Sequence, residues 1–232
     1  MTETTKAPVA RRTTRKSPSA SAAATGTAPE GLRAQGLRTR NAIVRVARKL
    51  LLETGPMDFS LRAVALRAGI SISNLQYYFP TRPAVLRAVM EPDIKVYLDE
   101  LRLVVDKKVT PHEVFELILQ QTLKDLKDAK YVALWRHFLS FASTDPECAH
   151  LFDEWYETLT VELARVIRGM NQKYDVASSM QVAALVISMG DGLALQLGTG
   201  RTGRTELNGL EERYRTMAYS MVEFGATRAR EK

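Results

Sequence analysis

The sequence predicts an all-α protein, with an N-terminal helix-turn-helix domain of three helices and a C-terminal helical bundle whose long helices dimerise. Apolar residues recur at intervals of three and four along most of the chain. Residues that commonly begin helices stand directly before several of these periodic runs, at Ser60, Ser71, Thr81, Thr110 and Asp145. No segment shows the alternating apolar and polar pattern of a strand.

Composition divides the 232 residues into three parts. Residues 1–36 are rich in Thr, Ala, Ser and Pro and contain a basic cluster, so we expect a disordered basic arm. Residues 37–90 are expected to form the helix-turn-helix domain. Residues 91–232 are expected to form a second domain that binds an effector and dimerises. The N-terminal arm is either an additional DNA contact or an inert leader.

Two short helices joined by a tight turn are predicted between Ser60 and Arg82. Ser60 can cap the first helix, and Gly69 stands where a left-handed residue ends a helix without a steric penalty. Ser71 can cap the second helix, which Pro80 ends. Such a two-helix unit can present its second helix to the major groove of DNA.

The second helix carries small polar and aromatic side chains that suit contacts with base edges and phosphates. Its apolar positions are spaced to face inward, which leaves the polar positions outside. We assign base contacts to Ser73, Asn74 and Gln76. Phosphate contacts are assigned to Arg62, Tyr77, Tyr78, Thr81 and Arg82, and Ser71 completes the candidate DNA-binding set.

This segment resembles the DNA-binding region of the TetR family of bacterial transcription regulators. The matching residues are Gly69-Ile70-Ser71, Leu75 and the run Tyr77-Tyr78-Phe79-Pro80-Thr81-Arg82, and the likeness extends over residues 37–90. The sequence departs from the family pattern at Gln76, where a Tyr is frequent, and at Pro83, where an acidic residue is usual. The resemblance implies a double-stranded DNA operator as a partner.

The charge distribution agrees with this interpretation. Residues 1–90 contain 15 Lys and Arg against 4 Asp and Glu, whereas residues 91–232 contain 18 against 22. The two parts carry +11 and −4, which together give the net charge of +7. A basic first part is expected if only that part meets phosphates.

The predicted helix over residues 175–197 is apolar on most of its surface, so a monomer would leave apolar surface exposed. Its small residues would allow a second copy of the helix to approach closely. We therefore expect a homodimer interface, although the helix could instead be the centre of the bundle. The candidate interface residues are Ala183, Ala184, Ser188, Gly190, Asp191 and Ala194.

Residues from Trp135 to Phe141, Asp145-Pro146, Trp155 and Gly190-Asp191-Gly192-Leu193 loosely resemble the TetR subgroup that contains the choline-responsive glycine-betaine regulator. That resemblance implies a small-molecule effector of unknown identity and a homodimer. Apolar and aromatic residues could line such a pocket or could be ordinary core. The candidates are Phe115, Leu119, Trp135, Phe138, Trp155, Tyr156 and Met189.

No catalytic site, metal site or cofactor is expected. His112, His137 and His150 show no metal-ligand spacing to each other or to Cys148. Residues 198–203 match a dinucleotide-binding glycine pattern, but the preceding segment is predicted to be a helix rather than the required strand. We expect a cytoplasmic protein without a membrane partner, because Asp191 interrupts the most apolar run and Cys148 is the only cysteine.

The sequence therefore favours a homodimeric, ligand-responsive transcription regulator, and a repressor in particular, that reads a palindromic operator and is released by its effector. Two alternatives remain open. The two-helix turn could dock on a protein, in which case the chain would be a helical interaction module. The chain could also be a DNA-binding regulator that has a filled core and no small-molecule effector.

Overall fold

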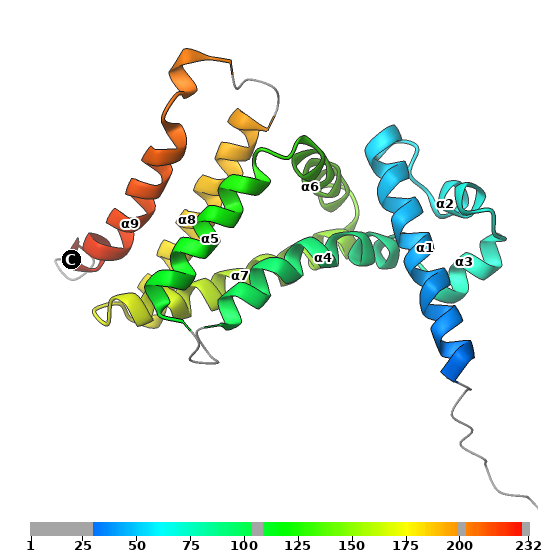
Figure 1. Cartoon of the computed structure of the whole chain (residues 1–232), viewed down its shortest axis with the longest axis horizontal. Coiled ribbons are helices and arrows are strands. Elements are labelled where there is room, and N and C mark those ends of the chain that lie inside the picture. Colours follow the sequence, from blue (N-terminus) through cyan, green and yellow to red (C-terminus); the bar gives the residue numbers. More distant parts are fainter. Residues whose placement is uncertain (1–29, 104–108, 199–202, 229–232) are drawn as a thin grey trace, which may run out of the picture.

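The computed structural model describes residues 30–103, 109–198 and 203–228, and these residues form α-helices, one short 3-10 helix and connecting turns without a strand. The prediction of an all-α protein is confirmed. The α-helices are α1 Glu30–Thr54, α2 Leu61–Ala68, α3 Ile72–Tyr78, α4 Arg82–Arg102, α5 Pro111–Asp125, α6 Ala129–Ala142, α7 Pro146–Met170, α8 Val176–Leu197 and α9 Leu210–Arg228. Helices α1–α3 form one end of the molecule, and α5, α8 and α9 lie toward the other (Figure 1).

The start and stop signals act as the sequence predicts. The hydroxyls of Ser60, Ser71 and Thr81 accept hydrogen bonds from backbone N–H groups in the first turns of α2, α3 and α4. Gly69 ends α2 with φ of 67°, in the left-handed region that a side chain would make costly. Thr110 and Glu113 form a reciprocal capping box at the start of α5.

The arm predicted for residues 1–36 falls mostly outside the described residues, and its last part, 30–36, belongs to α1. The glycine-rich segment at 198–203 also falls largely outside them. Helix α8, and not a strand, leads into that segment.

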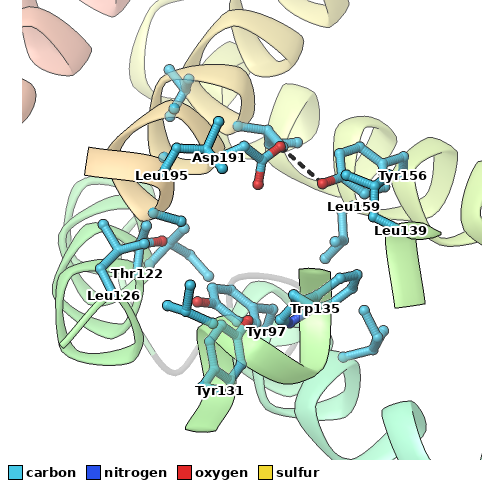
Figure 2. A pocket seen from close by; sticks show the side chains of 18 of the residues that line it. Tyr97, Thr122, Leu126, Tyr131, Trp135, Leu139, Tyr156, Leu159, Asp191 and Leu195 are labelled. Atoms are coloured by element: carbon cyan, nitrogen blue, oxygen red, sulfur yellow. Dashed lines mark hydrogen bonds between the residues drawn. The ribbon is translucent and has the colours of Figure 1, made fainter. Parts of the chain in front are cut away.

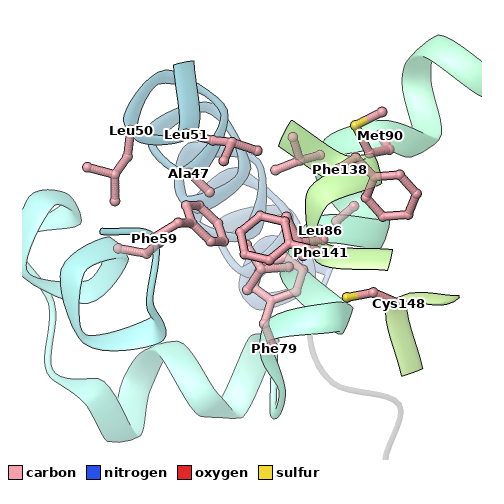
Figure 3. Close-up of a cluster of buried hydrophobic side chains, with 14 of the residues drawn as sticks. Ala47, Leu50, Leu51, Phe59, Phe79, Leu86, Met90, Phe138, Phe141 and Cys148 are labelled. Atoms are coloured by element: carbon pink, nitrogen blue, oxygen red, sulfur yellow. The ribbon is translucent and has the colours of Figure 1, made fainter. Parts of the chain in front are cut away.

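One cluster of buried side chains joins α1–α4 to α6 and α7 (Figure 3). Phe59 and Phe79 enter it from the N-terminal helices, and Phe138 and Phe141 enter it from α6. The rings of Phe59 and Phe141 are 5.8 Å apart between centroids. Because aromatic side chains each contribute a large buried area, α6 and α7 help to fix the position of the helix-turn-helix unit.

Helix α4 connects this cluster with a second one in the C-terminal part. Its residues Leu86 and Met90 belong to the first cluster, whereas Leu101 belongs to the second, together with side chains from α5, α7, α8 and α9. The boundary expected after residue 90 therefore lies inside one helix. Over the 19 residues that separate Arg82 from Leu101, α4 rises about 28 Å.

Pro92 lies inside α4, and the helix continues through it without ending. A proline inside a helix removes one N–H donor and strains the turn before it. Here Arg48 of α1 stabilises the affected turn. Its guanidinium donates to the Val89 carbonyl at 3.2 Å and to both carboxylate oxygens of Asp93, at 2.8 and 3.3 Å.

Ion pairs tie the first half of α4 to α7. Arg82 donates to Asp145 at 2.7 Å, and its guanidinium carbon lies 5.0 Å from the centre of the Phe141 ring. Arg87 forms a two-pronged pair with Glu154 at 3.1 and 2.7 Å. Asp145 also caps α7 by accepting from two backbone N–H groups. The Arg82 hydrogen bond is the main reason that the pKa of Asp145 lies below its ordinary value of 3.8.

We predict that Asp145→Asn lowers the melting temperature by about 1–3 °C at pH 7, because asparagine still caps α7 but no longer pairs with Arg82. Since the folded pKa of Asp145 is depressed, its stabilising contribution is present above pH 3.8 and is lost as the pH falls through the lower folded value. Asp128→Asn, which alters the cap of α6, is the matched control. Equal melting temperatures for the two variants at pH 7 would contradict the prediction.

Candidate nucleic-acid interface and ligand pocket

Helix α3 presents a polar outer face because its apolar residues are anchored in the first cluster. Leu75 and Phe79 are buried, and they fix the rotation of the helix about its axis. The side chains between them lie outside: Ser73, Asn74, Gln76 and Tyr77 are all exposed, Tyr77 by 82%. This is the inward and outward division that the residue spacing predicts.

The remaining candidate DNA contacts surround this face in different ways. Ser71 is exposed, but its hydroxyl is engaged in capping α3. Tyr78 is partly buried, and its ring lies edge-on to that of Tyr77 at 5.1 Å. Arg62 projects from α2 and forms no ion pair with the described residues.

Two further candidates contact the C-terminal part of the chain. The Thr81 hydroxyl caps α4 and also lies 3.4 Å from the carboxylate of Glu147. Arg82 is paired with Asp145, as described above. Both therefore stand at the junction between the helix-turn-helix and α7, a role that sequence spacing alone does not reveal.

Sequence reasoning missed Arg40 of α1. Its guanidinium carbon lies 5.1 Å from the centre of the Phe79 ring, directly after the C-terminal end of α3. A cation held on an aromatic face keeps its donors free for other partners. The basic composition of α1 was a signal, but only the tertiary contact shows that Arg40 lies beside the C-terminal end of α3.

A cavity of about 340 Å³ lies between α4, α5, α6, α7, α8 and α9 (Figure 2). Six aromatic side chains and many aliphatic ones line it, with few polar groups, which is the usual composition of small-molecule sites. The aromatic residues are Tyr97, Tyr131, Trp135, Phe152, Tyr156 and Tyr214. Among the described residues, no three His, Cys, Asp or Glu side chains form a group that could hold a metal ion.

Asp191 of α8 provides a carboxylate at the wall of this cavity. The Tyr156 hydroxyl donates to one carboxylate oxygen at 2.8 Å, and the second oxygen points into the cavity (Figure 2). Asp191 is exposed on the single subunit, but neighbouring side chains at the cavity wall partly desolvate its carboxyl group. This desolvation raises the pKa of Asp191, and the Tyr156 hydrogen bond only partly offsets it.

Residues 43–89 match the model of bacterial regulatory proteins of the tetR family. Over these residues the chain has the helix-turn-helix of that family. A curated relative, the HTH-type transcriptional regulator PksA of Bacillus subtilis (strain 168), is 22% identical over 163 residues, which cover 68% of this chain and 78% of PksA.

Solved structures of transcription regulators share the fold of this chain. A transcriptional regulator from Saccharomonospora viridis in complex with choline is 18% identical with a TM-score of 0.60, over 81% of this chain and 97% of that one. Thermus thermophilus FadR in complex with lauroyl-CoA is also 18% identical, with a TM-score of 0.58, over 79% and 92% of the two chains. The relatives described here are transcription regulators rather than enzymes.

The pocket contains only part of the effector-binding set expected from sequence. Trp135 and Tyr156 line it, whereas Met189 is partly buried outside its lining. Four other candidates lie in the packed core: Phe115, Leu119, Phe138 and Trp155. Phe138 and Trp155 stand behind Trp135, with ring centroids 6.1 and 6.4 Å from it.

Sequence reasoning did not place Tyr97, Tyr131 and Tyr214 at the pocket, and it left Asp191 open as either an effector contact or a hydrogen-bonding residue of the dimer interface. The spacing of the first two tyrosines marks them as inward residues of α4 and α6. It does not show that the inward faces of three helices leave a space between them.

The expected dimer-interface residues divide between two faces of α8. Ala183 and Gly190 are buried inside the subunit, and a Cβ on Gly190 would lie 3.1 Å from the methyl group of Thr122. Ala194 is partly buried at the pocket. Ala184 and Ser188 lie on the exposed face, and Asp191 stands between that face and the pocket.

We predict that Asp191→Asn raises the melting temperature of the ligand-free protein by about 1–2 °C at pH 8, because it removes a desolvated charge but keeps an acceptor for Tyr156. The folded pKa of Asp191 is raised, so the desolvation cost appears only when the carboxyl group is ionised. Well below pH 3.8 Asp191 is protonated in both the folded and the unfolded wild type, and the cost is absent. It develops as the pH rises. The difference between the two proteins should therefore shrink on acidification. A variant less stable than wild type at pH 8 would contradict this.

Proposed function

We propose that this chain is a cytoplasmic homodimeric repressor that binds a palindromic operator through α3 and is released from it by a small-molecule effector. The single observation that supports operator binding best is the exposed polar face of α3, with Ser73, Asn74 and Gln76 outward and Leu75 anchored beneath. Side chains of this kind can form paired hydrogen bonds with base edges in the major groove. Two copies would read half-sites about one helical turn apart.

Phosphate contacts would come from residues around that face. Arg62, Arg40 and Tyr77 are accessible, and their donors would fix the position of α3 along the groove. Arg82 and Thr81 would contribute from the start of α4, where backbone N–H groups also favour an anion.

The homodimer is supported by the apolar face that α8 leaves uncovered. Exposed positions recur at intervals of three and four along it, including Ala184, Ser188 and Leu195. Leu185 and Leu195 are each 54% exposed, and only 28% of the most apolar 18-residue window is buried. By length and hydropathy alone α8 could also cross a membrane, but its carboxylate, its packing on α7 and α9, and the family favour pairing with a second copy.

Effector control is supported by the position of the pocket. Its walls include α4, which begins beside the DNA-binding face, and α8, which carries the proposed dimer interface. Ile94, Tyr97 and Leu101 of α4 line the cavity, and the same helix begins beside α3. Asp191 and Leu195 border both the cavity and the exposed face of α8. A ligand that fits only one arrangement of these helices would shift the spacing of the two DNA-binding units. Solved relatives bound to choline or lauroyl-CoA support the presence of a ligand.

The DNA-binding proposal predicts different effects for base-contacting and phosphate-contacting residues. After selection of duplexes from a random pool, Gln76→Ala should change the selected sequence, because it removes a base contact. Arg62→Ala should weaken binding to all duplexes and reduce the slope of log affinity against log salt by about 1. Fluorescence anisotropy titrations would measure both effects.

Lys130→Ala, on the exposed start of α6, removes the same charge away from α3 and should leave both properties unchanged. Wild-type protein that binds no duplex with steep salt dependence would contradict the proposal. That result would favour a protein-interaction module instead.

The dimer proposal predicts that Leu185→Glu dissociates the protein, because a carboxylate would be placed in the centre of an apolar interface. Light scattering after gel filtration should show the mass fall from twice 25.9 kDa toward 25.9 kDa. Val96→Glu, at another exposed apolar position on α4, is the matched control and should remain dimeric. A dimeric Leu185 variant, or a monomeric wild type, would overturn this interface.

A further inference from the structure

We propose that the pocket binds a hydrophobic organic cation, a quaternary ammonium or protonated amine with a bulky apolar body, and that Asp191 is its counter-ion. This inference rests on the proposed effector site and specifies the charge of its ligand. The fold does not determine the charge of the ligand, because one similar structure contains the cation choline and another the anionic thioester lauroyl-CoA. The residues of this pocket decide it.

The position of Asp191 is the first argument. Among the described residues no Lys, Arg or His forms an ion pair with its carboxylate. Its one hydrogen bond comes from the neutral Tyr156, and its other oxygen points into the cavity (Figure 2). A partly desolvated carboxylate with no charged partner is better stabilised by a cation than by water alone. A cation in the cavity would supply the missing partner.

Aromatic rings provide the second argument. Phe152 and Tyr156 stack at 4.3 Å between centroids beside Asp191, and Trp135 and Tyr131 lie across the cavity from it. Ring faces attract cations, and tryptophan attracts them most strongly. They offer no such attraction to an anion. Asp191 and these rings therefore both favour a cationic ligand over an anionic one.

The electrostatic surroundings are the third argument. Asp125 lies behind Tyr97, whose hydroxyl donates to it at 2.8 Å, so a second carboxylate is close to the opposite wall. Burial raises the pKa of Tyr97, Tyr131, Tyr156 and Tyr214, and a carboxylate, Asp125 or Asp191, raises each of them further. The only cation in the lining is Arg136, which is exposed to solvent. The cavity is thus biased toward negative potential.

The size of the cavity and the composition of its remaining walls indicate the uncharged part of the ligand. A cavity of about 340 Å³ falls in the range of sites for drug-sized molecules. Beyond Asp191 and the aromatic rings its walls are mainly aliphatic, including Ile94, Leu126 and Val186. The ligand therefore needs an apolar body attached to its charged group, and a small cation such as choline would leave part of the cavity unfilled.

Three probes of similar length test the charge: decyltrimethylammonium, N-decylacetamide and decanoate, all kept below their micellar concentrations. Trp135 and Trp155 are the only tryptophans, so intrinsic fluorescence reports on the pocket, and calorimetry gives the dissociation constants. We expect the cation to bind at least tenfold more tightly than either of the others. Equal affinities, tightest binding of decanoate, or no binding of the cation would overturn the proposal.

Two variants assign the effect to Asp191. Asp191→Asn should weaken cation binding at least tenfold and change N-decylacetamide binding less than twofold, whereas Asp153→Asn, on the exposed surface of α7, should change neither. Arg136→Gln should leave cation binding unchanged or tighter. Cation binding that survives in Asp191→Asn would overturn the counter-ion role.

The same preparations are tested for duplex binding with and without the probes. Intact DNA binding together with a failed cation preference would overturn only the ligand class and leave the regulator proposal standing. Loss of all DNA binding by the wild type would instead contradict the proposed function, whatever the probes show.

Discussion

The shared packing of α4 is the constraint on which the rest of the structure depends. Its first half is buried with α1, α6 and α7, and its second half lines the pocket and enters the C-terminal core. Arg48 stabilises the turn beside Pro92, so the helix passes from one cluster to the other without ending. Because α4 joins the two clusters, the proposed effector control would require a shift at Tyr97 or Leu101 to be transmitted along this helix toward α3.

Under the proposed function, stability and ligand binding would impose opposite demands on Asp191. A neutral side chain at position 191 would avoid the partial desolvation of a carboxylate. The chain instead places Asp191 between the cavity and the exposed face of α8, with Tyr156 as its one hydrogen-bond donor. Local rules of packing are most often broken at functional sites, and a carboxylate at the wall of a mainly apolar cavity is such a departure.

Features set by neighbouring residues could be predicted from the sequence, whereas features set by tertiary contacts could not. Ser60, Gly69 and Ser71 act through groups two to four residues away, so the turn before α3 followed directly from their order. By contrast, the contact of Arg48 with α4 beside Pro92 joins residues 41 positions apart, Arg48 and Val89, and local spacing does not reveal it. The pocket was only partly predicted, because Phe138 and Trp135 have the same apolar periodicity and only their packing separates core from lining.

Arg82 illustrates how one side chain can serve both parts of the molecule. Sequence spacing assigned it to DNA phosphates, and the structure pairs it with Asp145 over the Phe141 ring. These contacts hold the start of α4 against the start of α7, and α7 continues to Tyr156 at the pocket. Because guanidinium donors form a planar fork with several N–H groups, Arg82 can keep Asp145 and still offer a donor to a phosphate. Movement of α7 relative to α4 would then displace a DNA contact directly, without requiring the helix-turn-helix core to deform.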